Sequence, residues 1–223
     1  MIYLPVPLFL FLLFLLLFPF IWVAVTLDVV EVAVAKLGFS PTVAFFLLAA
    51  VLVGSVINIP LYKVESTVTI VPDFMDLWLQ QFWGIPLQKI RQKTIVALNV
   101  GGGLIPVLLA IYELTRSDAI AILLVTAIVT FVCYFSARVV PGIGIQMNAL
   151  VAPLTASISA VVIAAESLVP SVAFAGGILG TLIGADLLHL KEIQRMTSGV
   201  LSIGGAGVFD GIALCGLFAL LLT

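Results

Sequence analysis

Two aspartates stand in segments of the chain that are otherwise apolar. Asp186 lies in the stretch GTLIGADLLHL, where His189 follows it, and Asp210 lies in SIGGAGVFDGI, inside the last apolar segment. An ionised carboxylate at the centre of a bilayer costs about 2.5–3.5 kcal/mol on insertion scales, so such residues indicate functional sites by default. These two carboxylates are therefore the first candidates for chemistry.

Three interpretations are open for the pair, and the first is catalytic. One aspartate would be protonated and the other ionised, because two carboxylates about 3 Å apart cannot both carry charge. Such a pair activates water for the hydrolysis of a peptide bond. This predicts an intramembrane aspartyl protease with Asp186 and Asp210 as catalytic residues and a membrane protein as substrate.

In the second interpretation the chain is a transporter or channel, and Asp210 binds a cation or a proton near the middle of the bilayer. Asp186 and His189 would act as a relay at the cytoplasmic mouth. Backbone carbonyls of an unwound glycine run would complete the site: Gly204, Gly205 and Gly207. In the third interpretation each aspartate bonds to a neighbouring helix and only stabilises the bundle.

The depth of the two aspartates separates these interpretations. Asp186 lies near the end of its predicted helix and Asp210 lies well inside the next one, so straight antiparallel helices would hold the carboxylates about 10 Å apart in depth. They would meet only if the last helix is broken at residues 204–207, where glycine lowers the helix propensity. The protease interpretation requires this break, whereas ion binding does not.

Polar and small residues also align in two other apolar segments. The first stripe falls within about 40° of one direction at 100° per residue and comprises Asn99, Gly103, Pro106, Ala110 and Glu113. The second stripe comprises Asn148, Ala152, Thr155 and Ser159. Each stripe either lines a substrate or ion path or marks a tight helix crossing held by small and polar side chains.

Glycines recur every four residues before the first aspartate, at Gly176, Gly180 and Gly184. Such rows let helix backbones approach closely. In a regular α-helix Asp186 points about 160° away from Gly184, on a stripe that it shares with His189. The row is therefore predicted to pack against a helix, within this chain or across a homo-oligomer interface, and does not itself present Asp186.

Metal, cofactor and nucleic-acid sites are not indicated. The chain has one histidine, both cysteines (Cys133 and Cys215) lie inside apolar segments, and there is no HExxH spacing. We expect no metal ion and no cofactor. A net charge of -2 without a basic run excludes a nucleic-acid partner.

The composition indicates a membrane protein of several spans. Of 223 residues, 63% are hydrophobic and only 9% charged, and the mean hydropathy is +1.36. Soluble domains carry about 25% charged residues. The first apolar run exceeds the roughly 7–15 residues of a signal-peptide core and lacks a positive start, so we expect a retained transmembrane helix. The lipid bilayer is then the principal partner.

Seven stretches are long enough to cross a bilayer, which needs about 20 apolar residues per helix. They are residues 4–27, 41–62, 94–114, 119–139, 143–165, 169–190 and 200–222. We predict an all-α bundle, a single integral membrane domain over residues 1–223, with some spans broken at glycine or proline. The fifth stretch opens with PGIGI and could begin as a re-entrant piece.

Basic residues set the orientation of such a bundle. With seven crossings, one side collects seven of the nine Lys and Arg residues and the other side only Lys36 and Arg116. This places the N-terminus in the cytoplasm and the C-terminus outside. Residues 63–93 form the cytoplasmic interfacial connection, in which STVTIV alternates like a strand and a helix follows from Asp73.

Two family resemblances follow from these motifs. NIPLY (58–62), LNVGGGLIP (98–106), PGIGI (141–145), GTLIGADLLHL (180–190) and SIGGAGVFDGI (202–212) resemble, in this order, a prokaryotic family of multi-pass membrane proteins known only as a domain of unknown function. That resemblance implies a prokaryotic plasma-membrane protein and no particular reaction.

The second resemblance is to presenilin-like intramembrane aspartyl proteases. Phe209-Asp210 is similar to their Tyr-Asp motif, and Gly184 to Asp186 is similar to their Gly-x-Gly-Asp motif. Ala185 replaces the second glycine, and the order of the two motifs is reversed. The resemblance implies catalytic roles for Asp186 and Asp210.

Overall fold

The computed structural model describes residues 6–69, 89–140, 144–192, 199–204 and 211–223. The chain divides into two compact units, Met1–Ala49 and Ala50–Thr223. The first unit contains α1 (Val6–Ala35) and the start of α2 (Pro41–Gly54), joined by a turn at Gly38. Most side chains of α1 are apolar and exposed, which suits a helix that contacts lipid and not water.

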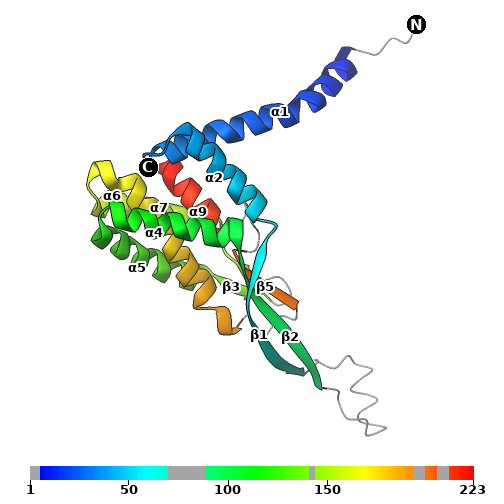
Figure 1. Ribbon diagram of the computed structural model, residues 1–223, viewed down its shortest axis with the longest axis vertical. Coiled ribbons are helices and arrows are strands. Elements are labelled where there is room, and N and C mark those ends of the chain that lie inside the picture. Colours follow the sequence, from blue (N-terminus) through cyan, green and yellow to red (C-terminus); the bar gives the residue numbers. More distant parts are fainter. Residues whose placement is uncertain (1–5, 70–88, 141–143, 193–198, 205–210) are drawn as a thin grey trace. The chain divides into compact units, whose positions relative to one another are not determined.

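The second unit is built on five α-helices that lie side by side (Figure 1). They are α4 (Ile105–Arg116), α5 (Ala119–Ser136), α6 (Val151–Ile163), α7 (Val169–Thr181) and α9 (Gly211–Leu222). The central helix is α7, which contacts the other four and has 10 of its 13 residues buried. Two π-helical turns, η1 (Val100–Leu104) and η3 (Leu182–Leu187), and the 3-10 turn η2 (Glu166–Leu168) adjoin these helices.

The described chain is mostly helical, as predicted, but strands form a sheet beside the helices, so the prediction of an all-α bundle is not confirmed. The strands β1 (Asn58–Thr69) and β2 (Lys89–Asn99) pair antiparallel, and β5 (Gly199–Ile203) pairs parallel to β2. A short hairpin joins β3 (Arg138–Val140) and β4 (Gly144–Gln146). Val, Ile and Thr are frequent in β1 and β2 and favour strands, but a short apolar run of this kind cannot be told from a buried helix by periodicity.

Several predicted spans are consequently shorter as helices than expected. The second predicted span is helical only to Gly54, the third from Val100, the fifth from Val151 and the seventh from Gly211. In place of one helix broken at glycine or proline, each of these four spans contains a strand beside a shorter helix. The strand predicted from Ser66 is confirmed up to Thr69, whereas the helix predicted from Asp73 lies outside the described residues.

Three helical stretches are long and apolar enough to cross a membrane: Leu10–Ala35, Ala119–Ser136 and Glu166–Glu192. The helices Pro41–Gly54 and Val151–Ile163 are apolar but shorter. At 1.5 Å per residue, α4 and α9 each span about 18 Å, less than the roughly 30 Å of a hydrocarbon core. The described helices are compatible with a membrane protein, and seven crossings remain a prediction.

Candidate functional site

Two positions that are far apart in sequence, Gly103 and Gly204, lie against each other in the second unit. A Cβ atom built on Gly204 would lie 2.6 Å from the backbone nitrogen of Gly103, and Gly204 has a φ of +67°. Only glycine tolerates both the close approach and the left-handed backbone. Gly204 follows directly on the strand β5, so the residues before it are not helical, and the rest of the predicted break at residues 204–207 lies outside the described residues.

A buried asparagine ties this junction together. Asn99 is 0% exposed, and its amide nitrogen donates to the backbone oxygen of Ser55 at 2.7 Å and to Oδ1 of Asn58 at 3.2 Å. Its Oδ1 accepts from the backbone N–H of Gly102 at 2.8 Å and so caps η1. Ser202 of β5 donates to the same Asn58 oxygen. Both amide hydrogens of Asn99 are thus used inside the chain, which is a structural role.

The stripe predicted from Asn99 to Glu113 is the inner face of this segment. Gly103, Pro106, Ala110 and Glu113 are all buried with Asn99. Because α4 packs against α7, a carboxylate on this face lies inside the helical unit. The α-helical phase applies only within α4, from Pro106 to Glu113, because Asn99 ends a strand and Gly103 lies in a π-helical turn.

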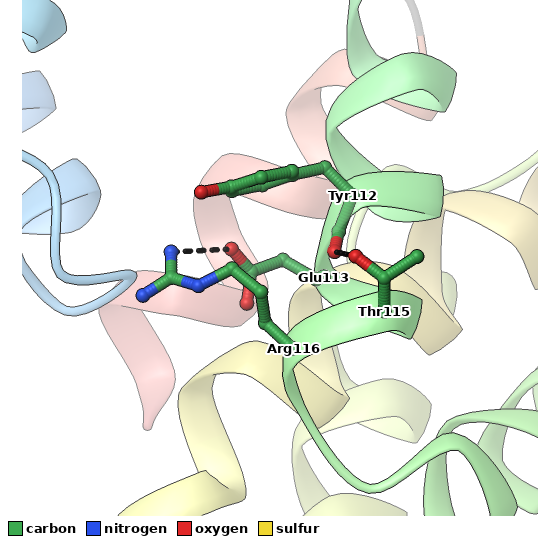
Figure 2. A network of polar contacts seen from close by, with 4 residues as sticks. All are labelled: Tyr112, Glu113, Thr115 and Arg116. Atoms are coloured by element: carbon green, nitrogen blue, oxygen red, sulfur yellow. Dashed lines mark hydrogen bonds and ion pairs between the residues drawn. The ribbon is translucent and has the colours of Figure 1, made fainter.

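Figure 2 shows the surroundings of Glu113 at the end of α4. Its Oε1 lies 3.8 Å from Nη1 of Arg116, and the Arg116 guanidinium lies 5.1 Å from the centre of the Tyr112 ring. Thr115 donates to the backbone oxygen of Tyr112 at 2.7 Å. Neither Glu113 Oε1 nor the buried hydroxyl of Ser117 has a hydrogen-bond partner.

The polar stripe predicted on the fifth span does not coincide with the inner face of α6. Asn148 is exposed and accepts from the backbone N–H of Leu150, and Thr155 and Ser159 are half-buried. Thr155 donates to the backbone of Val151 in its own helix. The residues that α6 buries are mostly small: Ala152, Pro153, Ala156, Ser157 and Ala160.

The glycine row packs against α5, as its spacing predicts. A Cβ on Gly180 would lie 2.5 Å from Cβ of Val129, and one on Gly184 would meet the backbone oxygen of Thr130. Gly177, on the next face of α7, lies against Ala156 and Cys215. The row therefore packs within the chain.

His189 lies on a different face from the one predicted. Its Nδ1 is 3.1 Å from the backbone oxygen of Gly184 and 3.0 Å from that of Ala185, and its ring stacks on Tyr134 of α5. The reason is η3, where Leu188 bonds to Ile183 five residues back, so each later residue is rotated relative to an α-helix. A carbonyl can only accept, so Nδ1 is the donor in both contacts.

Of the two candidate catalytic residues, one is described. Asp186 is half-buried in η3 and close enough to Cys133 of α5 to interact electrostatically with its thiol. Asp210, Gly205 and Gly207 lie outside the described residues, and α9 begins directly after them at Gly211.

The helices that carry these segments pack closely. Figure 1 shows α9 running back alongside α7. A Cβ on Gly177 would lie 3.0 Å from Cys215 Sγ.

Comparison with protein families gives one match, to the family described as "Protein of unknown function (DUF1614)", over residues 52–222. The chain belongs to the DUF1614 family. No curated protein and no solved structure matches it.

The DUF1614 match covers almost all of the second unit and contains the five motifs from NIPLY to SIGGAGVFDGI. The resemblance to a family of unknown function is thereby confirmed. None of these comparisons supports the resemblance to presenilin-like proteases.

Two features of this DUF1614 protein could not be predicted from sequence. Asn58 and Ser202 are the partners that hold Asn99, yet only the NIPLY motif marks Asn58 at all. Tyr134 is the stacking partner of His189.

Within the described part of the chain, no cluster of three His, Cys, Asp or Glu side chains could hold a metal ion.

Proposed function

We propose that this DUF1614 protein is a multi-pass membrane hydrolase in which Asp186 and Asp210 together activate water to cleave a peptide bond of a membrane-embedded substrate. The observation that carries the proposal is the break at Gly204. The last span is not a straight helix. The estimate for straight helices, which placed the two carboxylates about 10 Å apart in depth, therefore does not apply.

The packing of α7 against α9 supports the same conclusion. Gly177 of α7 lies against Cys215 of α9, and the two helices run in opposite directions (Figure 1). Asp186 follows Gly177 in the sequence and Asp210 precedes Cys215, so both are expected toward the same end of this helix pair. We infer that the two carboxylates can be brought to a similar depth.

Two carboxylates at one depth can divide the work of hydrolysis. The ionised aspartate takes a proton from the attacking water, and the protonated one donates to the carbonyl oxygen of the scissile bond.

The proposal includes a setting in a prokaryotic plasma membrane. The distribution of basic residues supports a cytoplasmic N-terminus and an external C-terminus. In that orientation η3 is near the cytoplasmic side, so water reaches the aspartates from the cytoplasm.

The test of activity uses the full chain in liposomes with a set of transmembrane peptides, and mass spectrometry to detect cleavage. Asp186→Asn and Asp210→Asn should each lower the rate at least about 100-fold, the usual contribution of a general acid or base. Asp28→Asn in α1 is the matched control and should cleave like the wild type. Equal cleavage in all four proteins would exclude the aspartate pair.

A second test needs no substrate. In a chain with Cys133 and Cys215 replaced by alanine, Asp186→Cys and Asp210→Cys should form a disulfide, which requires Cα atoms less than about 7 Å apart. The pair Asp186→Cys with Asp28→Cys is the control. Failure of the first pair to cross-link under oxidation would rule out the diaspartyl site.

A second candidate function is the transport of a proton or cation at Asp210. It is favoured by the contact of Gly103 with Gly204, because backbone groups at breaks inside a membrane must be satisfied by protein, water or an ion. Asn99, Gly103 and Glu113 would line the path. Ion flux that is abolished by Asp210→Asn, without any peptide cleavage, would favour transport over hydrolysis.

A further inference from the structure

The strands β1 and β2 have all of their charged residues on one face. Successive residues of a strand belong to opposite faces of a sheet, and residues that are directly paired share a face. The register of β1 and β2 therefore places every Lys, Arg, Asp and Glu of the two strands on the same face. This charged face comprises Lys63, Glu65, Lys89, Arg91 and Lys93. The positions between them form a neutral face, which comprises Tyr62, Val64, Ser66 and Val68 of β1 and Ile90, Gln92, Thr94 and Val96 of β2.

The charged face is strongly basic. Its four basic residues and one acidic residue give it a net charge of +3, whereas the whole chain has a net charge of -2. Lysine and glutamate are depleted in strands, so strand formation alone does not account for this arrangement. A surface on which one sign of charge gathers indicates a partner of the opposite sign.

The charged face is open where β1 and β2 leave the third strand of the sheet. Strand β5 pairs with β2 only between Thr94 and Leu98, so residues 65–69 and 89–93 form a two-stranded ribbon. Figure 1 shows this ribbon extending away from the helices. At its base, Thr94 and Val96 of the neutral face are fully buried, whereas Lys63 of the charged face is exposed.

Exposed apolar residues at the start of β1 indicate that the ribbon begins beside lipid. Val56 is 82% exposed, Ile57 50%, Ile59 41% and Leu61 51%. In a membrane protein such residues are expected to contact the hydrocarbon of the bilayer. Lys63 follows Leu61 by two positions, which is about 7 Å along a strand. The basic residues therefore start where the hydrocarbon gives way to the headgroups.

We propose that the charged face of this ribbon binds the anionic phospholipid headgroups of the cytoplasmic leaflet, so that the ribbon lies along the membrane surface. The headgroups are the anionic surface nearest to the basic residues, and their charge is complementary to +3. The proposal rests on the membrane setting proposed above, and it is independent of Asp186 and Asp210.

The length of the ribbon decides how it must lie. Each basic residue near an anionic membrane strengthens binding about fivefold, and this attraction falls off within a Debye length of about 8 Å. From Lys63 to Thr69, the partner of Lys89, the ribbon is about 20 Å long. An upright ribbon would hold Lys89 beyond the reach of the headgroups, whereas a ribbon along the surface brings all four basic residues to them.

Fluorescence quenching in lipid nanodiscs tests this arrangement. The full chain carries a fluorophore at Ser66→Cys, a position of the neutral face, and the native cysteines are buried and should not be labelled. The discs contain phosphatidylcholine with or without phosphatidylglycerol, together with a lipid that bears a quencher on its headgroup. We expect stronger quenching with phosphatidylglycerol. This difference should vanish at about 1 M salt, where the Debye length is only about 3 Å.

Charge variants supply the controls. Lys89→Gln, Arg91→Gln and Lys93→Gln together should shift the equilibrium between bound and free ribbon about 100-fold toward the free ribbon. Glu65→Gln should shift it about fivefold toward the bound ribbon. A matched variant removes three exposed basic residues from other parts of the chain and should be quenched like the unaltered chain: Lys36→Gln, Arg138→Gln and Lys191→Gln.

Equal quenching in the two lipid mixtures would overturn the proposal, and so would quenching that neither salt nor the triple ribbon variant changes. If the triple ribbon variant does not fold, the effects of lipid, salt and Glu65→Gln decide. Binding of polyglutamate by the labelled chain, without any preference for phosphatidylglycerol, would assign the charged face to an acidic protein instead. Peptide cleavage is measured separately, so the ribbon and the aspartate site can fail independently.

Discussion

At the scale of single residues, the polar groups inside this protein differ in how completely they are satisfied. Asn99 uses both amide hydrogens and its oxygen within the chain, whereas Glu113 leaves an oxygen without a hydrogen bond. A satisfied polar group fixes a structure, and an unsatisfied one is costly unless it changes its charge or gains a partner. The same buried stripe therefore contains one residue whose polar atoms are all paired and one whose Oε1 is not.

Asn99 should be essential for stability. Asn99→Ala leaves the Gly102 N–H and the Ser55 carbonyl unpaired, at about 1–3 kcal/mol for each buried group left unsatisfied. Asn99→Asp should be worse, because a carboxylate would face two acceptor oxygens. The midpoint of thermal unfolding in detergent measures this, with the exposed Asn148→Ala as control. Equal midpoints for Asn99→Ala and Asn148→Ala would contradict the structural role.

Gly204 should tolerate no side chain. In Gly204→Ala the backbone strain of a positive φ costs roughly 1–2 kcal/mol, and the new Cβ also collides with Gly103. Gly38→Ala carries the same kind of strain, with a φ of 79°, at an exposed turn. We expect a clearly larger loss of thermal stability for Gly204→Ala than for Gly38→Ala. Similar losses of stability would show that Gly204 does not lie tightly against Gly103.

At the scale of elements, the central helix α7 is made of residues that allow close approach on several faces. Its glycine row, continued into η3, faces α5, while Gly177 faces α6 and α9. Small residues on each face let four helices approach one, which larger side chains would prevent. The π-turn η3 then rotates the chain, so that His189 returns to α5 beside Tyr134.

Alanine at two glycines of this packing should have different effects. At Gly184 the new methyl group meets the backbone of Thr130, which cannot move without shifting α5. At Gly216 it meets the side-chain ends of Ile178 and Phe174, which can change rotamer. We expect Gly184→Ala to lower the unfolding midpoint by several degrees more than Gly216→Ala. The reverse order would mean that α5 and α7 are not held at this distance.

At the scale of the whole molecule, the alternation of helix directions supports the proposed membrane topology. In Figure 1, α5 and α7 run against α4, α6 and α9, as successive crossings require. In the proposed orientation the start of β1 is cytoplasmic, and the turn η2 between α6 and α7 is external.

Cysteine labelling tests this topology. Lys63 and Glu166 are both exposed, and the native Cys133 and Cys215 are buried and should not react. A maleimide that cannot cross the plasma membrane is added to cells whose outer layers let it reach that membrane. It should label Glu166→Cys and not Lys63→Cys. In inverted membrane vesicles the same reagent should label Lys63→Cys and not Glu166→Cys. Labelling of both from one side would contradict the proposed number of crossings.

Several features of this protein were encoded locally and could be predicted from the sequence. The apolar composition predicts membrane helices, and glycine runs mark the positions where strands end, at the π-turn of residues 100–104 and at Gly204. The buried face of α4 from Pro106 to Glu113 and the close packing of the glycine row follow from helical periodicity. Each depends only on residues within a few turns of one another.

Tertiary structure alone decided which segments meet. β2 pairs with β5 across 105 positions (Thr94 with Gly199), and no local pattern names a strand's partner. The partners of Asn99 come from β1 and from the turn before it, and the face of His189 depends on a π-turn that breaks the expected 100° step. Strand pairing and the phase of a helix are set by the lowest free energy of the whole packed unit. The sequence predicts where regular elements end, and only the fold determines what those ends contact.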